Sequence, residues 1–239
     1  PSFLTSIIFD IYIISLVKWF VNMSHQNILM CFFLPLVCQR QKKEKDMILP
    51  IVAYGDPVLK KRAEDISRDY PELEKLIADM FETMESADGV GLAAPQVGLG
   101  IRLFVVDAAP FSEDEELPKD EREFLKGFRR AFINPVIEEE WGDPWGFEEG
   151  CLSIPGIHEK VFRPESIRIK YMDSRWNECT EELSGLAARV VQHEYDHLEG
   201  TVFTDRLSPL SKRMIQKRLQ NISQGHANAR YPMRFPHRK

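Results

Sequence analysis

The sequence predicts an α+β fold in which antiparallel or mixed β-sheets pack around one central helix. The first observation is that apolar, β-branched runs typical of strands come mostly before the helical segments, without strand–helix–strand alternation. The second is a largely apolar helical stretch at 185–200 that contains the pattern His-Glu-x-x-His. The third is composition, because 239 residues with 44% hydrophobic and 28% charged side chains suit one good-sized globular core.

Charge and cysteine content exclude some classes of protein. The net charge of −6 provides no broad basic face, so we expect no DNA partner. The four cysteines form no close pair of the zinc-ribbon type, and their spacing does not suggest a disulfide framework. A reducing compartment is the simpler expectation, which predicts a cytoplasmic protein.

Residues 1–46 differ in composition from the rest of the chain. Two apolar runs, 3–21 and 28–38, precede a polar, mostly basic run at 39–46. Charged residues interrupt the first run, and the second is too short to span a bilayer. Neither a signal peptide nor a transit peptide is indicated. We interpret 1–46 as upstream sequence absent from the working protein, with a membrane anchor or a folded extension as alternatives. Membrane contact is expected only if this segment is retained.

The main domain is predicted to span residues 47–223. A strand-like opening leads to a turn at 55–57. Residues 71–86 place apolar side chains at helical spacing, with Pro71 in the first turn, and predict a core-packing helix. Residues 101–107 predict a buried strand. Residues 108–128, rich in Asp, Glu and Lys, predict a solvated loop or insertion with a short helix near 121–126.

The second half of the domain continues the pattern. Strands are predicted at 131–139 and 165–173, with an aromatic-anchored turn at 141–147. Residues 185–200 predict a helix that ends at Gly200. Residues 208–223 predict a last, basic amphipathic helix, and 224–239 are expected to be a disordered tail.

The His-Glu-x-x-His pattern predicts a metal site. His193 and His197 lie four residues apart, which places them on one helix face with about 5–6 Å between their Cβ atoms. Glu194 can then lean over a metal-bound water and take its proton. A chance pattern is the alternative, but the apolar flanks weaken it, because these three polar side chains are costly to bury without partners.

A catalytic site of this kind usually has three protein ligands and one water. The third ligands of the zinc proteases are missing, because no glutamate follows Glu199 and the extended motif would need a histidine at Phe203. Upstream, Cys151 stands in a tight apolar turn at 149–156, and a thiolate is a good ligand for Zn²⁺ or Fe²⁺. A lone cysteine is more often a small buried hydrophobic residue, so that interpretation stays beside the first.

The stretch DGVGLAAPQVG at 88–98 predicts an open, extended strand. Gly89 and Gly91 stand two apart and face one side, so another backbone can approach closely. Gln96 provides a neutral amide that can donate a hydrogen bond to a developing oxyanion. A glycine-rich loop is the alternative; a phosphate-binding loop is rejected because no Gly-Lys-Ser/Thr follows.

Together these three stretches resemble the peptide deformylase family. Its motifs GxGxAAxQ, EGCxS and QHExDH stand here intact, in that order, at 89–96, 149–153 and 192–197. The resemblance runs from about Met47 to Asp205 and leaves 1–46 uncovered. It implies that family's α+β fold and the removal of formate from N-formylmethionine at the start of newly made polypeptides.

The resemblance also implies roles for single residues. One divalent metal ion, usually Fe²⁺ with Zn²⁺, Ni²⁺ or Co²⁺ as alternatives, would be bound. Its implied ligands are Cys151, His193 and His197. Glu194 would be the general acid/base, and Gln96 and the N–H of Leu152 would stabilise the oxyanion.

We expect the substrate, an N-formylmethionyl peptide, to dock as an added strand along 88–92, held by main-chain bonds, with Gly91 presenting its backbone and Gly89 as a further substrate-binding residue. One apolar pocket would take the methionine side chain. Its candidate lining residues are Val90, Leu152 and the helix residues 186–190. His158 stands where some family members carry Arg, and its contact with the substrate backbone is an open expectation.

Two charged features allow more than one interpretation. If Arg189 lies in the wall of the methionine pocket, its guanidinium must extend into solvent or pair with an acidic side chain. Otherwise Arg189 faces away from the pocket. Glu149 and Arg163 either form an ion pair that orients the metal site or pair at the surface, which is the commoner fate of such residues.

Two other functions stay open. One is a zinc peptidase; the other is a metal-stabilised domain or an inactive relative that binds ribosomes or nascent chains. Intact Glu194 and Gln96 weigh against the second, because neither is needed to hold a structural metal. The basic last helix is interpreted as a solvated face, with a transient contact to ribosomal RNA as the alternative.

Overall fold

The computed structural model describes residues 47–236, and its largest element is a five-stranded antiparallel sheet. The spatial order of the strands is β2-β3-β4-β7-β8. The strand bounds are β2 (Gly91–Ala93), β3 (Leu103–Asp107), β4 (Arg129–Trp141), β7 (Ser166–Met172) and β8 (Glu178–Ser184). β2 is an edge strand, so one side of its backbone pairs with no other strand of the part described.

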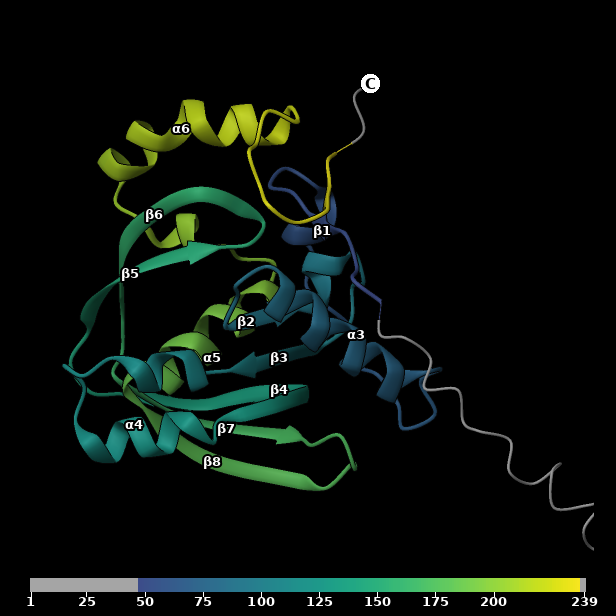
Figure 1. The fold of residues 1–239 in the computed structure, drawn as a ribbon, viewed down its shortest axis with the longest axis vertical. Helices are drawn as coiled ribbons and strands as arrows, with labels where there is room; N and C mark the ends of the chain where they lie inside the picture. Colours follow the sequence, from purple (N-terminus) through teal and green to yellow (C-terminus); the bar gives the residue numbers. More distant parts are fainter. Residues whose placement is uncertain (1–46, 237–239) are drawn as a thin grey trace, which may run out of the picture. The chain divides into compact units, whose positions relative to one another are not determined.

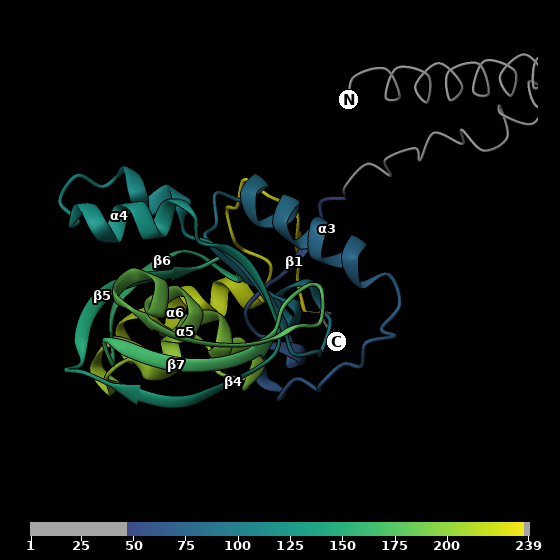
Figure 2. The ribbon, with the colours of Figure 1, turned by 90° about the horizontal axis from the view of Figure 1, so that it is seen from below.

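A single buried helix, α5 (Gly185–Leu198), lies between this sheet and the antiparallel hairpin of β5 (Trp145–Cys151) and β6 (Ile154–Arg163), as Figures 1 and 2 show. All of its residues except Gly185 and Tyr195 are buried. Gly185, at φ +58°, has the left-handed conformation that glycine adopts readily where the strand turns into the helix. The predicted fold class is therefore confirmed, with the His-Glu-x-x-His helix at its centre.

The remaining helices cover the edges of this core. They are α3 (Leu73–Ser86), α4 (Lys119–Lys126) and α6 (Pro209–Ser223), with the 3₁₀ helices η1 (Pro57–Lys60), η2 (Ala94–Val97), η3 (Ala109–Glu113) and η4 (Phe203–Arg206). The predicted helix at 71–86 is confirmed as α3, which buries Ile77, Met80 and Met84 at helical spacing. The predicted last helix at 208–223 is confirmed as α6, with Ser208 as its N-cap.

Three local predictions were wrong. The expected turn at 141–147 ends early, because β5 already begins at Trp145. β6 and β8 were not predicted, because their buried residues do not alternate regularly with exposed ones: β8 buries only Leu183, and β6 has an irregular burial pattern. The short helix expected near 121–126 is confirmed as α4, but the solvated loop expected for the rest of 108–128 is wrong, because η3 forms there and Leu125 and Phe128 are buried in the core.

The segment expected to be a disordered tail also has a defined position. β9 (Met233–Arg234) pairs in parallel with β1 (Ile51–Val52), so residues 224–236 return from α6 to the start of the domain. The tail prediction is wrong for these residues because backbone pairing with a distant strand compensates for their polar composition. The interpretations of 1–46 fall outside the described residues. Within the described residues, no helix is long and apolar enough to cross a membrane.

Candidate metal centre and catalytic cleft

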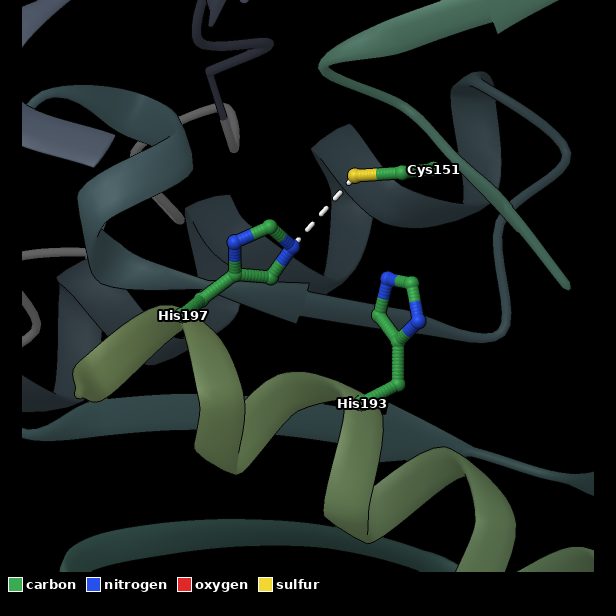
Figure 3. Close-up of side chains that lie close together, drawn as sticks. All are labelled: Cys151, His193 and His197. Atoms are coloured by element: carbon green, nitrogen blue, oxygen red, sulfur yellow. Dashed lines mark hydrogen bonds between the residues drawn. The ribbon is translucent and has the colours of Figure 1, made fainter. Parts of the chain in front are cut away.

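Three side chains from two elements converge on one point. Cys151 ends β5, while His193 and His197 stand one turn apart on α5 (Figure 3). One ligating atom from each lies within 4.8 Å of the others, and Cys151 Sγ is 3.3 Å from Nε2 of His197. The sequence predicted this set, and the fold brings it together.

The ring of His193 is held by a buried carboxylate. Its Nδ1 lies 2.9 Å from Oε2 of Glu149, so its Nε2 is the nitrogen left for a metal ion. Burial raises the pKa of Glu149, but hydrogen bonds from Arg163 and His193 outweigh burial and hold that pKa far below its usual range. The carboxylate is therefore charged and fixes the tautomer of His193.

Buried arginines balance that carboxylate. Arg163 is fully buried and donates from Nε and Nη2 to Glu149 at 2.7 and 2.9 Å. Its Nη1 donates to Asp196 at 2.7 Å, and Asp196 in turn accepts from Arg206. The Glu149–Arg163 pair thus lies behind the metal ligands, and the alternative of surface pairing is wrong.

Arg189 pairs with an acid, as one of its three interpretations expected. Its Nη1 donates to Glu149 at 3.0 Å, and its Nη2 donates to the carbonyl oxygen of Trp145 at 2.7 Å. The guanidinium also lies over the Trp145 ring, 4.3 Å from its centroid. Although Arg189 borders the cleft, its charge is directed into the protein.

Glu194 lies against the glycine strand. Its side chain is buried, and Oε2 has no hydrogen-bond partner among the described residues. Burial raises the pKa of Glu194 to about 7, against the opposing effect of His193. A methyl group on Gly91 would lie only 2.8 Å from Cδ and Cγ of Glu194. Only glycine at position 91 leaves room for the carboxylate of Glu194. The sequence had suggested another reason for this glycine, the close approach of a second backbone.

Gln96 points into the same site. It is 1% exposed, and its Oε1 accepts from the N–H of Ala93 at 2.8 Å. That bond fixes the amide so that Nε2 lies 3.4 Å from both Cys151 Sγ and Ser153 Oγ. The donor face of the amide is thus directed at the mouth of the Cys–His–His cluster.

A cavity of about 520 Å³ opens over these groups. The predicted residues that line it are Gly89, Val90, Gly91, Gln96, Cys151, Leu152, His158, His193 and Glu194. His158 is exposed at the cavity wall beside Gly150, and of the helix candidates, Arg189 and Val190 line the cavity while Leu186 does not.

Two further parts of the wall were missed. Phe111 and Phe147 meet edge to face with their ring centroids 6.5 Å apart, and residues 228–231 of the C-terminal segment complete the lining. The aromatic content of both stretches was visible, but only tertiary packing places them beside α5.

The cluster suits a transition-metal ion. A thiolate and two imidazoles form a donor set that Zn²⁺ or Fe²⁺ accepts, and three protein ligands leave a position for water or substrate. His197 is fully buried, and its Nδ1 finds no partner among the described residues, so Nε2 is its only atom directed at the cluster.

Comparisons with known proteins agree with this geometry. The model of the family described as "Polypeptide deformylase" matches residues 48–213, which include all three motifs. The chain belongs to the peptide deformylase family. The peptide deformylase of Christiangramia forsetii is 60% identical over 81% of this chain and 98% of its own length. That of Cytophaga hutchinsonii is 55% identical over 81% of this chain and its full length.

Solved structures give the same result. The crystal structure of the peptide deformylase from Thermotoga maritima has a TM-score of 0.59 and 42% identity, over 68% of this chain and 99% of that one. The chain is an enzyme of the peptide deformylase family, which favours deformylation over the zinc-peptidase alternative. Residues 214–236 lie beyond the part matched by the family model, although 228–231 among them line the cleft.

Proposed function

We propose that this chain removes the formyl group from N-formylmethionine at the start of newly made polypeptides. The observation that carries the proposal is that Cys151 and His193 of the Cys–His–His cluster line a cleft that also holds an unpaired buried carboxylate and an amide donor. A structural metal site needs neither of the last two groups. Hydrolysis of a formamide needs both, as a proton carrier and as an oxyanion donor.

Cys151, His193 and His197 would hold one divalent ion. Fe²⁺ is the proposed native metal, with Zn²⁺, Ni²⁺ or Co²⁺ able to replace it. When bound, the ion would lower the pKa of a water molecule and polarise the formyl oxygen. The thiolate brings a negative charge to the ion, so water is acidified less than beside three histidines, and the proton acceptor becomes more important.

Glu194 would be that proton acceptor. Its unpaired Oε2 takes a proton from the attacking water as the C–O bond forms at the formyl carbon. The same oxygen then delivers the proton to the leaving nitrogen as the C–N bond breaks. Formate and a free α-amino group result. Gly91 leaves the space in which this carboxylate can make both transfers.

Gln96 and Leu152 would stabilise the oxyanion. The amide Nε2 of Gln96 is already fixed by its bond to Ala93, so it donates without a cost of reorganisation. Leu152 follows Cys151 in the turn between β5 and β6, and its N–H would provide the second donor.

The peptide would add to the free edge of the sheet beside β2. The N–H of Gly89 is already bonded to the carbonyl oxygen of Met84, so Gly91 in β2 would offer the main-chain hydrogen bonds, which accept any sequence after the first residue. The methionine side chain would enter the apolar part of the cavity. Its proposed walls are Val90, Phe111, Phe147, Leu152 and Val190. His158, exposed at the cavity wall, would contact the peptide backbone further along.

The substrate also suggests a place of action. Nascent chains carry the formyl group as they leave the ribosome, so we place this activity in the bacterial-type cytoplasm. A transient ribosome contact through α6 belongs to the same proposal. Its Lys212 and Arg218 are partly engaged within the chain, donating to the carbonyl oxygens of Asp205 and Gly156.

The test compares formate release from N-formyl-Met-Ala-Ser with cleavage of unformylated Met-Ala-Ser, using protein whose metal content has been measured. We expect formate from the first peptide and no product from the second. The same assay on a chain that begins at Met47 asks whether 1–46 contributes. Internal cleavage of either peptide, or no formate from metal-loaded protein, would refute the proposal.

A further inference from the structure

The C-terminal segment of the described chain returns to the active site. Residues 228–231 line the same cavity as Cys151 and His193 of the Cys–His–His cluster, and β9 immediately afterwards pairs with β1. This segment lies about 80 residues after Cys151 in the sequence and beyond the residues matched by the family model. Its contacts with the cleft therefore need their own explanation.

The turn that follows Cys151 is fixed at two successive carbonyl oxygens. The carbonyl oxygen of Ser153 accepts from the backbone N–H of Tyr54 at 2.8 Å. The carbonyl oxygen of Leu152 accepts from the hydroxyl of Tyr231, also at 2.8 Å. Tyr54 follows β1 and Tyr231 precedes β9, so the paired terminal strands brace this turn through both residues.

The other side of the turn is held by Gln96, whose Nε2 lies 3.4 Å from Ser153 Oγ. Of these three anchors, the bond from Tyr231 acts on Leu152 itself. The carbonyl oxygen of Leu152 lies in the peptide plane that Leu152 shares with Ser153, and Cys151 on the other side is paired with Ile154. Holding both sides limits the backbone dihedral angles of Leu152, and with them the direction of its N–H. A hydrogen bond of this length is also lost cleanly when one oxygen atom is removed.

We propose that Tyr231 is a positioning residue, whose hydroxyl holds Leu152 so that its N–H faces the developing oxyanion. This inference rests on the proposed function, in which that N–H stabilises the oxyanion. A purely structural role is the competing explanation, because the ring of Tyr231 also packs against the core cluster that contains Met84 and Leu92. The positioning role requires the hydroxyl of Tyr231, whereas the packing role requires only its ring.

The experiment compares Tyr231→Phe with a matched control, Tyr70→Phe. Tyr70 packs against the same core cluster, and its hydroxyl has no hydrogen bond among the described residues. Both variants lose one oxygen and keep the ring. In the zinc-loaded enzyme, kcat and KM for N-formyl-Met-Ala-Ser would be measured, together with the backbone amide NMR signals of Leu152 and Ser153.

We expect Tyr231→Phe to lower kcat about tenfold with KM within about twofold of the unmodified chain, less than the effect of removing an oxyanion donor. The amide signals of Leu152 and Ser153 should shift, and Tyr70→Phe should change neither property. If kcat stays within twofold, if those signals do not move, or if Tyr70→Phe loses as much activity, the inference is overturned. An unmodified chain that releases no formate would instead refute the proposed function.

Discussion

Nδ1 of His193 and Oε2 of Glu149 lie 2.9 Å apart, with both side chains buried. This contact joins the metal ligands to the buried arginines, because the same carboxylate accepts from Arg163 and Arg189. Glu149 therefore orients one histidine and is the anionic partner of Arg189, while it shares the neutralisation of Arg163 with Asp196. The four predictions below concern this network and the cleft above it.

Glu149→Gln should destabilise the fold and weaken metal binding together. Loss of the charge leaves Arg189 without an anionic partner and Arg163 with Asp196 alone, which costs about 3–5 kcal/mol for a buried pair. The changed partner of His193 should weaken metal affinity by about 10–100-fold. Urea unfolding and a metal-competition titration measure the two effects.

The control for this prediction is Glu139→Gln. Glu139 pairs with Arg168 at 2.7 Å, but both side chains are exposed, so the loss should be under about 1 kcal/mol. Equal losses of stability in the two variants would contradict the role given to the buried network.

Gly91→Ala should lower kcat about a hundredfold while the fold stays intact. The added methyl group would meet Glu194 and displace its carboxylate from the site. Gly100→Ala is the matched control, because a Cβ there has no atom within 4 Å. Formate release is the measurement, and a Gly91→Ala enzyme as fast as Gly100→Ala would disprove the steric argument.

Glu194→Ala should retain its metal ion and lose nearly all hydrolysis. The proposed ligands stay in place, whereas the group that carries the proton is gone, a loss of about 10²–10⁴-fold in rate. Elemental analysis of the purified variant and the formate assay give the two quantities. Near-normal turnover with a full metal site would remove this mechanism.

Gln96→Leu should lower kcat about 10²–10³-fold, since it removes a donor aimed at the oxyanion. It also leaves the N–H of Ala93 without its acceptor, at about 1–3 kcal/mol. Gln96→Glu separates these effects, because it keeps an acceptor for Ala93 and loses the donor. Both variants should lose activity, but only Gln96→Leu should lose that hydrogen bond; a fully active Gln96→Glu enzyme would contradict the assignment.

The sequence alone determined the fold class and which three residues form the Cys–His–His cluster. Helical spacing places His193 and His197 on one face whatever surrounds the helix, and three short motifs in order indicate the family. Helical spacing and short motifs depend only on residues close together in the sequence, so they can be recognised without knowing how the chain packs. The edge strand at Gly91 and the core face of α3 were predictable for the same reason.

Tertiary structure decided what each polar group near that cluster does. Whether Glu149 and Arg163 are buried together, and whether Arg189 turns inward, depends on the hairpin β5–β6 closing over α5. The return of Tyr231 to Leu152 depends on the pairing of β9 with β1, at opposite ends of the described chain. These contacts join residues far apart in sequence, where no periodicity reports them, and burial and charge pairing are properties of the assembled fold.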